Sequence, residues 1–102
     1  MIAELVERHD ELVRLCEQFG VTRLDVFGSA TGGDFDATRS DIDFLVELEP
    51  PAGMARFDAY FGLKEALEAL LGRPVDLVVP AALANPYIAE AVERTREPLY
   101  AA

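Results

Sequence analysis

Thiols and positive charges are scarce in this chain of 102 residues. It has one cysteine, Cys16, so an intramolecular disulfide and a multi-cysteine metal site are both excluded. It has one lysine, Lys64, and eight arginines against 19 acidic residues, which gives a formal net charge of −10. Nucleic-acid backbones are bound by clustered Lys and Arg, and here the basic residues are scattered. The composition therefore argues against nucleic acid as a direct partner.

Long apolar runs are absent as well. No stretch of about 18 apolar residues is available to span a membrane. The first ten residues carry three carboxylates and no apolar segment of signal-peptide length. We therefore expect a cytoplasmic protein with no membrane association. Because 51% of the residues are hydrophobic, a disordered acidic tail is excluded, and residues 1–102 are expected to form a single domain with its own core.

The hydrophobic pattern predicts a small α/β domain. Apolar residues recur at helical spacing up to residue 19, and Gly20 is placed to end that helix. Strands are predicted at 21–27, 41–48 and 75–79, further helices at 57–71 and 85–96, and a short edge strand at 99–100. This order indicates an α/β fold, or an α+β fold if the sheet is mixed. The aromatic residues Phe57, Tyr60 and Phe61 are expected in the core.

Two aspartates stand two residues apart on the predicted strand 41–48. Residues at this spacing point to the same face of a strand, about 6.5–7 Å apart at Cα. Asp41 and Asp43 would therefore repel each other by roughly 3 kcal/mol at 5 Å and an effective dielectric near 20. A divalent cation would remove that penalty, and hard oxygen ligands suit Mg²⁺. If the strand of Asp76 is adjacent, three carboxylates could hold two metal ions.

Each aspartate also has a plainer interpretation. Asp41 could be a turn residue at the entrance of the strand, and Asp43 could face solvent. Asp76 could cap a helix or pair with Arg73. A calcium-binding EF-hand loop is excluded, because the glycine required at its sixth position is missing in either possible register.

A Gly-Ser pair directly follows the predicted strand 21–27. Gly28 allows the backbone to approach a ligand closely, and Ser29 offers a hydroxyl and an N–H group. Arg39, the only cation of the loop that follows, could contact phosphate or be a solvated loop charge. The sequence contains neither a P-loop nor a dinucleotide-binding fingerprint. The informative feature is the order of a strand, Gly-Ser, a polar loop and Asp-x-Asp on a second strand.

This order closely resembles the nucleotidyltransferases of the DNA-polymerase-beta superfamily, and most of all the minimal nucleotidyltransferases (MNT) of prokaryotic toxin–antitoxin modules. The motifs that carry the resemblance are Val26-Phe27-Gly28-Ser29, Gly33-Asp34-Phe35-Asp36 and Ser40-Asp41-Ile42-Asp43-Phe44-Leu45-Val46. Asp76 matches the third carboxylate of the family, so the similarity covers nearly the whole chain. One departure is that eleven residues, instead of the usual ten, separate Ser29 from Asp41. This affects the conformation of the loop more than the metal site.

The resemblance implies a mixed sheet with helices on one side and an active-site cleft at the Gly-Ser turn. Asp41 and Asp43 would bind two Mg²⁺ ions. Asp76 would bind the ion that activates the attacking hydroxyl, and would serve as the general base or lie near it. Gly28 and Ser29 would hold the β- and γ-phosphates of ATP.

The implied reaction is attack by an acceptor hydroxyl on the α-phosphorus of ATP, with pyrophosphate leaving. In this family the acceptor is a tyrosine of a partner HEPN-domain toxin, a helical RNase, so the protein would be an antitoxin that transfers AMP. The alternative is a non-catalytic antitoxin that neutralises its partner by direct association, and the intact motif favours the enzyme. Modification of a small molecule is disfavoured, because about 100 residues leave no second domain to shape an acceptor pocket. Homo- and hetero-oligomers both remain open.

Overall fold

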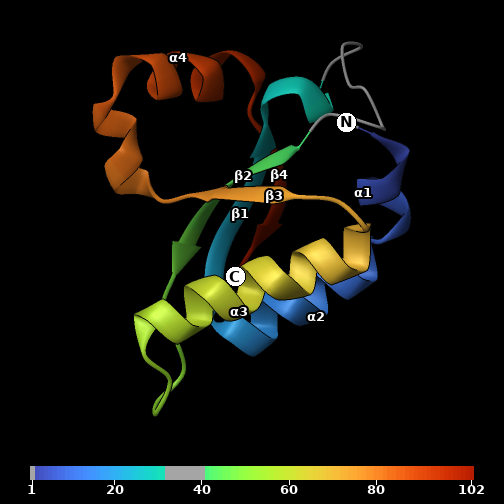
Figure 1. The fold of residues 1–102 in the computed structure, drawn as a ribbon, viewed down its shortest axis with the longest axis vertical. Coiled ribbons are helices and arrows are strands. Elements are labelled where there is room, and N and C mark those ends of the chain that lie inside the picture. Colours follow the sequence, from blue (N-terminus) through green and yellow to red (C-terminus); the bar gives the residue numbers. More distant parts are fainter. Residues whose placement is uncertain (1, 32–40) are drawn as a thin grey trace.

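The computed structural model describes residues 2–31 and 41–102. The elements along the chain are α1 (Ala3–Glu7), α2 (His9–Phe19), β1 (Val21–Phe27), the 3-10 helix η1 (Gly28–Thr31), β2 (Ile42–Leu48), α3 (Arg56–Leu71), β3 (Val75–Val78), the 3-10 helix η2 (Pro80–Ala84), α4 (Pro86–Thr95) and β4 (Glu97–Ala101). The strands form one sheet in the order β3-β2-β1-β4 (Figure 1). Strand β1 is antiparallel to β2 and β4, whereas β2 and β3 are parallel. The predicted mixed α/β fold is confirmed. Within the described residues, no helix has the length and apolar character needed to cross a membrane.

The single N-terminal helix predicted from the periodicity is two helices. Helix α1 ends at Glu7, and α2 begins at His9 after a break at Arg8 (φ −96°, ψ 13°). The backbone N–H of Ile2 donates to the carbonyl of Ala30 at 3.0 Å, which attaches the start of α1 to η1. An ion pair between Glu4 and Arg73 attaches α1 to the segment before β3. These contacts fix the direction of α1 independently of α2, and the spacing of apolar residues could not reveal them.

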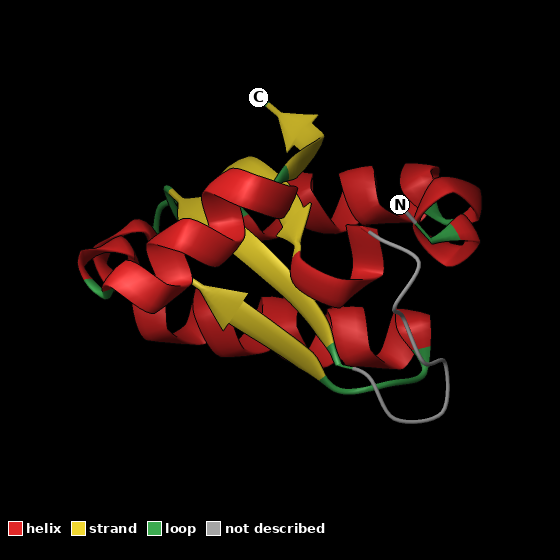
Figure 2. Cartoon of the chain, turned by 90° about the horizontal axis from the view of Figure 1, so that it is seen from above, coloured by secondary structure: helices red, strands yellow, loops and turns green. Residues whose placement is uncertain are grey.

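Helices cover both faces of the sheet, so the expectation of helices on one side is wrong. Helices α1, α2 and α3 pack against the main core, whose larger fully buried members from the strands include Leu24, Val26, Ile42, Phe44 and Val46. Helix α4 and η2 pack on the opposite face, over a smaller cluster of Phe27, Leu45 and Val92. Seen from above, helical segments lie over the strands as well as beneath them (Figure 2). Strands with apolar residues on both faces need cover on both.

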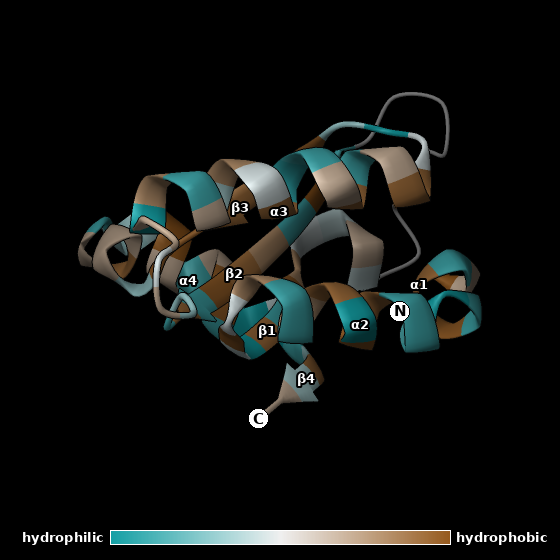
Figure 3. Cartoon of the chain, turned by 90° about the horizontal axis from the view of Figure 1, so that it is seen from below, coloured by the Kyte–Doolittle hydropathy of each residue, from teal (hydrophilic) through white to brown (hydrophobic). Residues whose placement is uncertain are grey.

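Strand β2 alternates as predicted, and the alternation decides where its aspartate points. Ile42, Phe44 and Val46 belong to the main core, and Leu45 belongs to the cluster under α4. Strand β2 is drawn largely in the hydrophobic colours of Figure 3, whereas α2 and α3 alternate between polar and apolar bands. Asp43 has the same parity as Leu45, and it therefore shares the face that α4 covers.

The prediction that Phe57 and Phe61 belong to the core is wrong, because these side chains are 70% and 44% exposed. The buried stripe of α3 consists of Ala59, Leu63, Leu67 and Leu71. Phe57 and Phe61 are each two residues away from members of that stripe, which corresponds to roughly 200° around a helix. Tyr60 is half-buried and packs against the main core, as expected.

Candidate functional site

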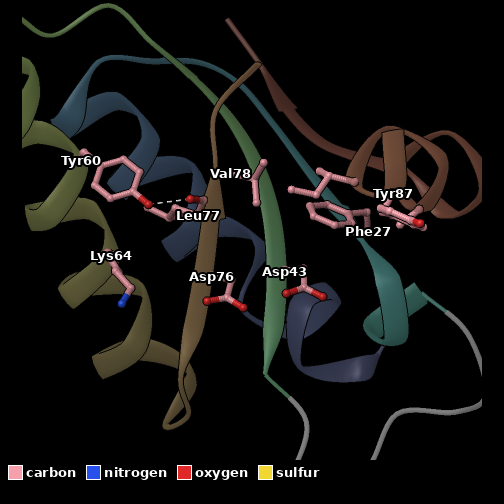
Figure 4. Close-up of a pocket in the computed structure, with 10 residues that line it drawn as sticks. Phe27, Asp43, Tyr60, Lys64, Asp76, Leu77, Val78 and Tyr87 are labelled. Atoms are coloured by element: carbon pink, nitrogen blue, oxygen red, sulfur yellow. Dashed lines mark hydrogen bonds between the residues drawn. The ribbon is translucent and has the colours of Figure 1, made fainter. Parts of the chain in front are cut away.

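Strands β1, β2 and β3 bring a glycine turn and two aspartates into one row. In the strand register, Phe27 lies opposite Asp43, and Asp43 lies opposite Asp76. Gly28 follows Phe27 directly. Because neighbouring strands are about 4.8 Å apart, the row crosses the sheet within roughly 10 Å. The two carboxylates project side by side from adjacent strands (Figure 4).

The row faces a cavity of about 450 Å³. Its lining consists of Phe27, Asp43, Tyr60, Lys64, Asp76, Leu77, Val78, Tyr87, Ile88 and Ala91. Helix α4 supplies an apolar wall, and α3 supplies Tyr60 and Lys64 on the far side of Asp76 (Figure 4). The cavity therefore has one apolar and one polar wall, with the carboxylates between them.

The carboxylate of Asp43 is destabilised where it lies. Burial raises its pKa to about 6, and the negative charge of Asp76, a hydrogen bond with Asp76 and the charge of Asp41 add to this rise. A cation held between Asp43 and Asp76 would replace the proton that this pair attracts. Paired carboxylate oxygens are the hard ligands that Mg²⁺ prefers, so this donor set fits the ion that the family implies.

Asp41 lies directly before β2 and is exposed to solvent. It is close enough to raise the pKa of Asp43 but is not part of the strand pairing. In the described part of the chain, no three His, Cys, Asp or Glu side chains converge on a common metal position. The preassembled part of the site is therefore the Asp43–Asp76 pair. A role of Asp41 as a ligand of both metals remains a proposal, and Arg39 lies outside the described residues.

Gly28 matters to the site because it has no Cβ atom, which leaves room for the Asp43 carboxylate. Its φ of 76° is in the left-handed region, and a Cβ atom on it would lie 2.7 Å from Oδ2 of Asp43. Its N–H donates to Oγ1 of Thr95 at 2.7 Å, and that hydroxyl donates to the carbonyl of Ala91 at 2.6 Å. The Gly28 amide is thus engaged by α4, and within the described chain no hydrogen bond engages the hydroxyl of half-buried Ser29.

Replacement of Gly28 by Ala is expected to displace the Asp43 carboxylate and to weaken Mg²⁺·ATP binding at least tenfold. The positive φ alone should cost about 1 kcal/mol of unfolding free energy. Gly72→Ala is the matched control, because Gly72 has a φ of 68° and open space where its Cβ would lie. Both variants should lose similar stability in thermal unfolding, but only Gly28→Ala should lose the ligand-induced rise in Tm. Equal ligand responses would contradict the role of Gly28.

Without metal, Asp43→Asn is expected to stabilise the protein at neutral pH. The folded pKa of about 6 exceeds the ordinary value, so the folded state retains a proton that the unfolded state releases. The parent therefore loses stability as the pH rises from about 4 to about 6, and the variant does not. After allowance for solvent screening, the gain above pH 7 is on the order of 1 kcal/mol, and it should shrink toward pH 4. Urea unfolding in EDTA at several pH values measures it. A less stable variant at pH 8 would make Asp43 a structural residue.

Three residues near the site were not identified from the sequence. Lys64 lies four residues after Tyr60 on α3, so both side chains reach the cavity from one helix face. Tyr87 lines the cavity from the first turn of α4 and is strongly exposed. Asp25 is fully buried on β1 and pairs with Arg96 and Arg23. The helical spacing of Tyr60 and Lys64 was the one available signal.

Nucleotidyltransferases are among the known proteins that this chain resembles. The nucleotidyltransferase domain family matches residues 11–98. Protein adenylyltransferase MntA of Thermococcus cleftensis is 39% identical over 80% of this chain and 77% of its own length. MJ0128 of Methanocaldococcus jannaschii, a proposed protein adenylyltransferase, is 34% identical over 90% of this chain and 88% of its own length.

The solved structures agree with the fold. A proposed minimal nucleotidyltransferase matches with a TM-score of 0.72 and 38% identity, over 93% of this chain and 92% of its own. A second match comes from a complex of an MNT antitoxin with a tri-AMPylated HEPN toxin of Shewanella oneidensis. The matching chain of that complex has a TM-score of 0.64 at 20% identity, over 96% of this chain and 73% of its own length. At that identity the second match speaks for the fold alone. The chain therefore belongs to the nucleotidyltransferase domain family, as a minimal nucleotidyltransferase related to the MntA protein adenylyltransferase.

Proposed function

We propose that this protein transfers AMP from ATP to a hydroxyl group of a partner protein, and that the modification silences a toxin. The observation that carries the proposal is the row of Gly28, Asp43 and Asp76 at the edge of one cavity. Phosphoryl transfer needs charge neutralisation and positioning more than covalent catalysis, and this row offers both. Family membership supports a nucleotidyl group as the group transferred.

The positions of the carboxylates support the roles that we propose for them. Asp43 and Asp76, with Asp41 beside them, would hold Mg²⁺, which supplies positive charge for the triphosphate when bound. Asp76 is exposed at the cavity, and we propose that it receives the proton of the attacking hydroxyl. A bond forms between the acceptor oxygen and the α-phosphorus, the bond from that phosphorus to the bridging oxygen of the β-phosphate breaks, and pyrophosphate leaves.

The two substrates would approach from opposite ends of the row. Ser29 lies at the β1 end, where its hydroxyl would contact the terminal phosphates. The apolar wall that Tyr87 and Ile88 contribute would cover the nucleoside. The acceptor hydroxyl would enter from the β3 end, beside Asp76. Because ATP is a cytoplasmic substrate, the protein would act in the cytoplasm.

The proposed partner is a HEPN-domain toxin, with a tyrosine hydroxyl as the acceptor. Among the structurally similar chains, one belongs to a toxin–antitoxin complex with AMP-PNP and another to a complex in which the HEPN toxin carries three AMP groups. Curated relatives above 30% identity are named protein adenylyltransferases. These findings support ATP as the donor and a protein as the acceptor.

The test uses the product of the reading frame next to that of this chain, which is expected to be a HEPN-domain protein. Its intact mass is measured before and after incubation with this protein and Mg²⁺·ATP, and one or more added AMP groups are expected. Peptide mapping then identifies the acceptor residue. Neutralisation of the toxin without any mass change would favour a non-catalytic antitoxin. A neighbouring frame that encodes no such protein would argue against the toxin as partner.

A further inference from the structure

An apolar concavity lies at the start of α3, outside the cavity of the active site. It has a volume of about 400 Å³ and is lined by Leu48, Arg56, Phe57, Tyr60, Phe61 and Val79, and we call it the aromatic groove. The rings of Phe57 and Phe61 are 4.6 Å apart between centroids, and those of Tyr60 and Phe61 are 5.0 Å apart. Of the five large apolar side chains that are exposed in the described chain, three lie in this groove. Such a concentration of exposed apolar surface is typical of a binding site.

The aromatic groove adjoins the active-site cavity. Tyr60 lines both, and its hydroxyl donates to the carbonyl of Leu77 on β3 at 2.5 Å, which fixes the ring between them (Figure 4). Val79 follows Asp76 by three residues and is still extended (φ −97°, ψ 159°). Three extended residues span about 10 Å, so the groove begins about that far from Asp76. It lies against the start of α3, displaced along β3 from the row, and a segment bound in it could reach the β3 end of the row, where the acceptor hydroxyl is proposed to enter.

Addition of a partner strand to β3 is disfavoured, although β3 is at the edge of the sheet. The N–H of Val75 donates to Oε2 of Glu68 at 3.0 Å, and the carbonyl of Leu77 accepts from Tyr60. Helix α3 thus satisfies backbone groups that an added strand would need. A partner at this edge is therefore expected to bind through side chains, and the aromatic groove offers an apolar surface for them.

The charges favour a different protein over a second copy of this chain. Two copies with a net charge of −10 each repel one another. The lining of the groove contains one cation, Arg56, and no carboxylate. Arg56 also donates to the carbonyl of Leu48 at 2.9 Å, so its charged group is held against another residue of the lining. An apolar segment with an acidic neighbour fits this surface.

We propose that the aromatic groove docks the protein acceptor, and that it takes apolar side chains lying about 10 Å from the hydroxyl that receives AMP. The proposal rests on the proposed function, since it assigns the surface that presents the acceptor to Asp76. In an extended acceptor segment, the anchoring side chains would be about three residues from the modified residue.

The test compares Phe57→Gln with Val6→Gln as a matched control. Val6 is 63% exposed, close to the 70% of Phe57, but it lies on α1. The probe is the neighbouring HEPN-domain protein in its unmodified form. Phe57→Gln is expected to raise the KM for the HEPN-domain protein at least tenfold. The kcat at saturation and the Mg²⁺·ATP-induced rise in Tm should stay at parental values. Val6→Gln should match the parent throughout, and Phe61→Gln should reproduce the effect of Phe57→Gln.

The outcomes separate this proposal from the proposed function. If the parent transfers AMP and Phe57→Gln has a parental KM, the docking proposal is wrong and the function stands. If the parent transfers no AMP, the proposed function fails, and calorimetric titration of the HEPN-domain protein still tests the groove. Equal affinity of parent and Phe57→Gln in that titration would overturn the docking surface. The proposal would also be overturned if the parent sediments as a dimer and Phe57→Gln sediments as a monomer, because the groove would then serve self-association.

Discussion

Asp76→Asn is expected to lower the single-turnover rate of AMP transfer by at least about 100-fold, the scale for loss of a general base or of an equivalent group that activates the nucleophile. The variant should lose far less affinity for Mg²⁺·ATP than rate of transfer, because Asp43, Asp41 beside it and the Gly28 turn remain in place. The rate and the affinity therefore respond differently to one substitution. Rapid-quench measurement of transfer and titration with ATP determine the two quantities separately.

The structural alternative for Asp76 makes the opposite prediction. Its side chain is exposed, and Arg73, the partner that the sequence allowed for it, pairs with Glu4. Removal of the Asp76 charge also relieves repulsion on Asp43, so the metal-free variant should unfold at or slightly above the parental Tm. A marked fall in Tm with unchanged turnover per folded molecule would make Asp76 structural. A rate within about threefold of the parent would falsify its catalytic assignment.

Asp58→Asn is the matched control for this experiment. Asp58 is an exposed aspartate in the first turn of α3, and the cavity lining does not include it. The same change of chemistry there should leave the rate of transfer and the affinity for ATP unchanged. A shared loss of rate would point to a general effect of net charge on binding of the acceptor instead of a local role of Asp76.

The strands and the direction of the Asp43 side chain could be predicted because they depend on local alternation. The contact between Asp43 and Asp76 could not, because it depends on the parallel pairing of β2 and β3 through the crossover helix α3. From the sequence alone, a site that includes Asp76 could be predicted only on the condition that its strand is adjacent to the strand of Asp43. The register then places the two aspartates directly opposite one another, which explains why the pKa of Asp43 is raised.

The features that were missed or mistaken depend on contacts between distant parts of the chain. Nothing near Gly28 in the sequence indicates that Thr95 accepts its N–H, since the two residues are 67 positions apart. Asp25 has the sequence context of an ordinary charged strand residue, yet it is fully buried, and its ion-pair partner Arg96 is 71 positions away. The exposure of Phe57 follows from which stripe of α3 meets the sheet, and an apolar helix offers several such stripes. Periodicity identifies an element, whereas these contacts require the tertiary arrangement.

The buried ion pair of Asp25 and Arg96 supports the active site by attaching α4 to β1. Oδ2 of Asp25 accepts from Nε of Arg96 at 2.5 Å and from Nε of Arg23 at 3.1 Å. Among the described residues, Oδ1 of Asp25 is buried without a hydrogen-bond partner, so the carboxylate depends on these arginines. Arg96 follows Thr95, whose hydroxyl accepts the N–H of Gly28. The pair therefore attaches the end of α4 to β1 at the place where the Gly28 turn is held.

Arg96→Met is accordingly expected to lower the free energy of unfolding by about 2–3 kcal/mol, below the usual range for a broken buried pair because Arg23 still compensates part of the charge. Arg94→Met is the matched control. Arg94 is on the same helix, is 70% exposed and pairs only at the surface with Glu90, so its loss should cost less than about 0.5 kcal/mol. Urea unfolding of both variants at pH 7.5 measures the difference.

A double variant separates two contributions to the loss of stability: the buried Asp25 charge left without Arg96, and the lost packing of the arginine side chain. Asp25→Asn in the Arg96→Met background removes the buried negative charge, and it should recover at least about 1 kcal/mol relative to Arg96→Met alone. Arg96→Met should also weaken Mg²⁺·ATP binding, because the end of α4 no longer holds Thr95 against Gly28. If Arg96→Met costs no more than Arg94→Met and leaves nucleotide affinity unchanged, the ion pair supports neither the fold nor the turn, and the link between Asp25 and the active site is wrong.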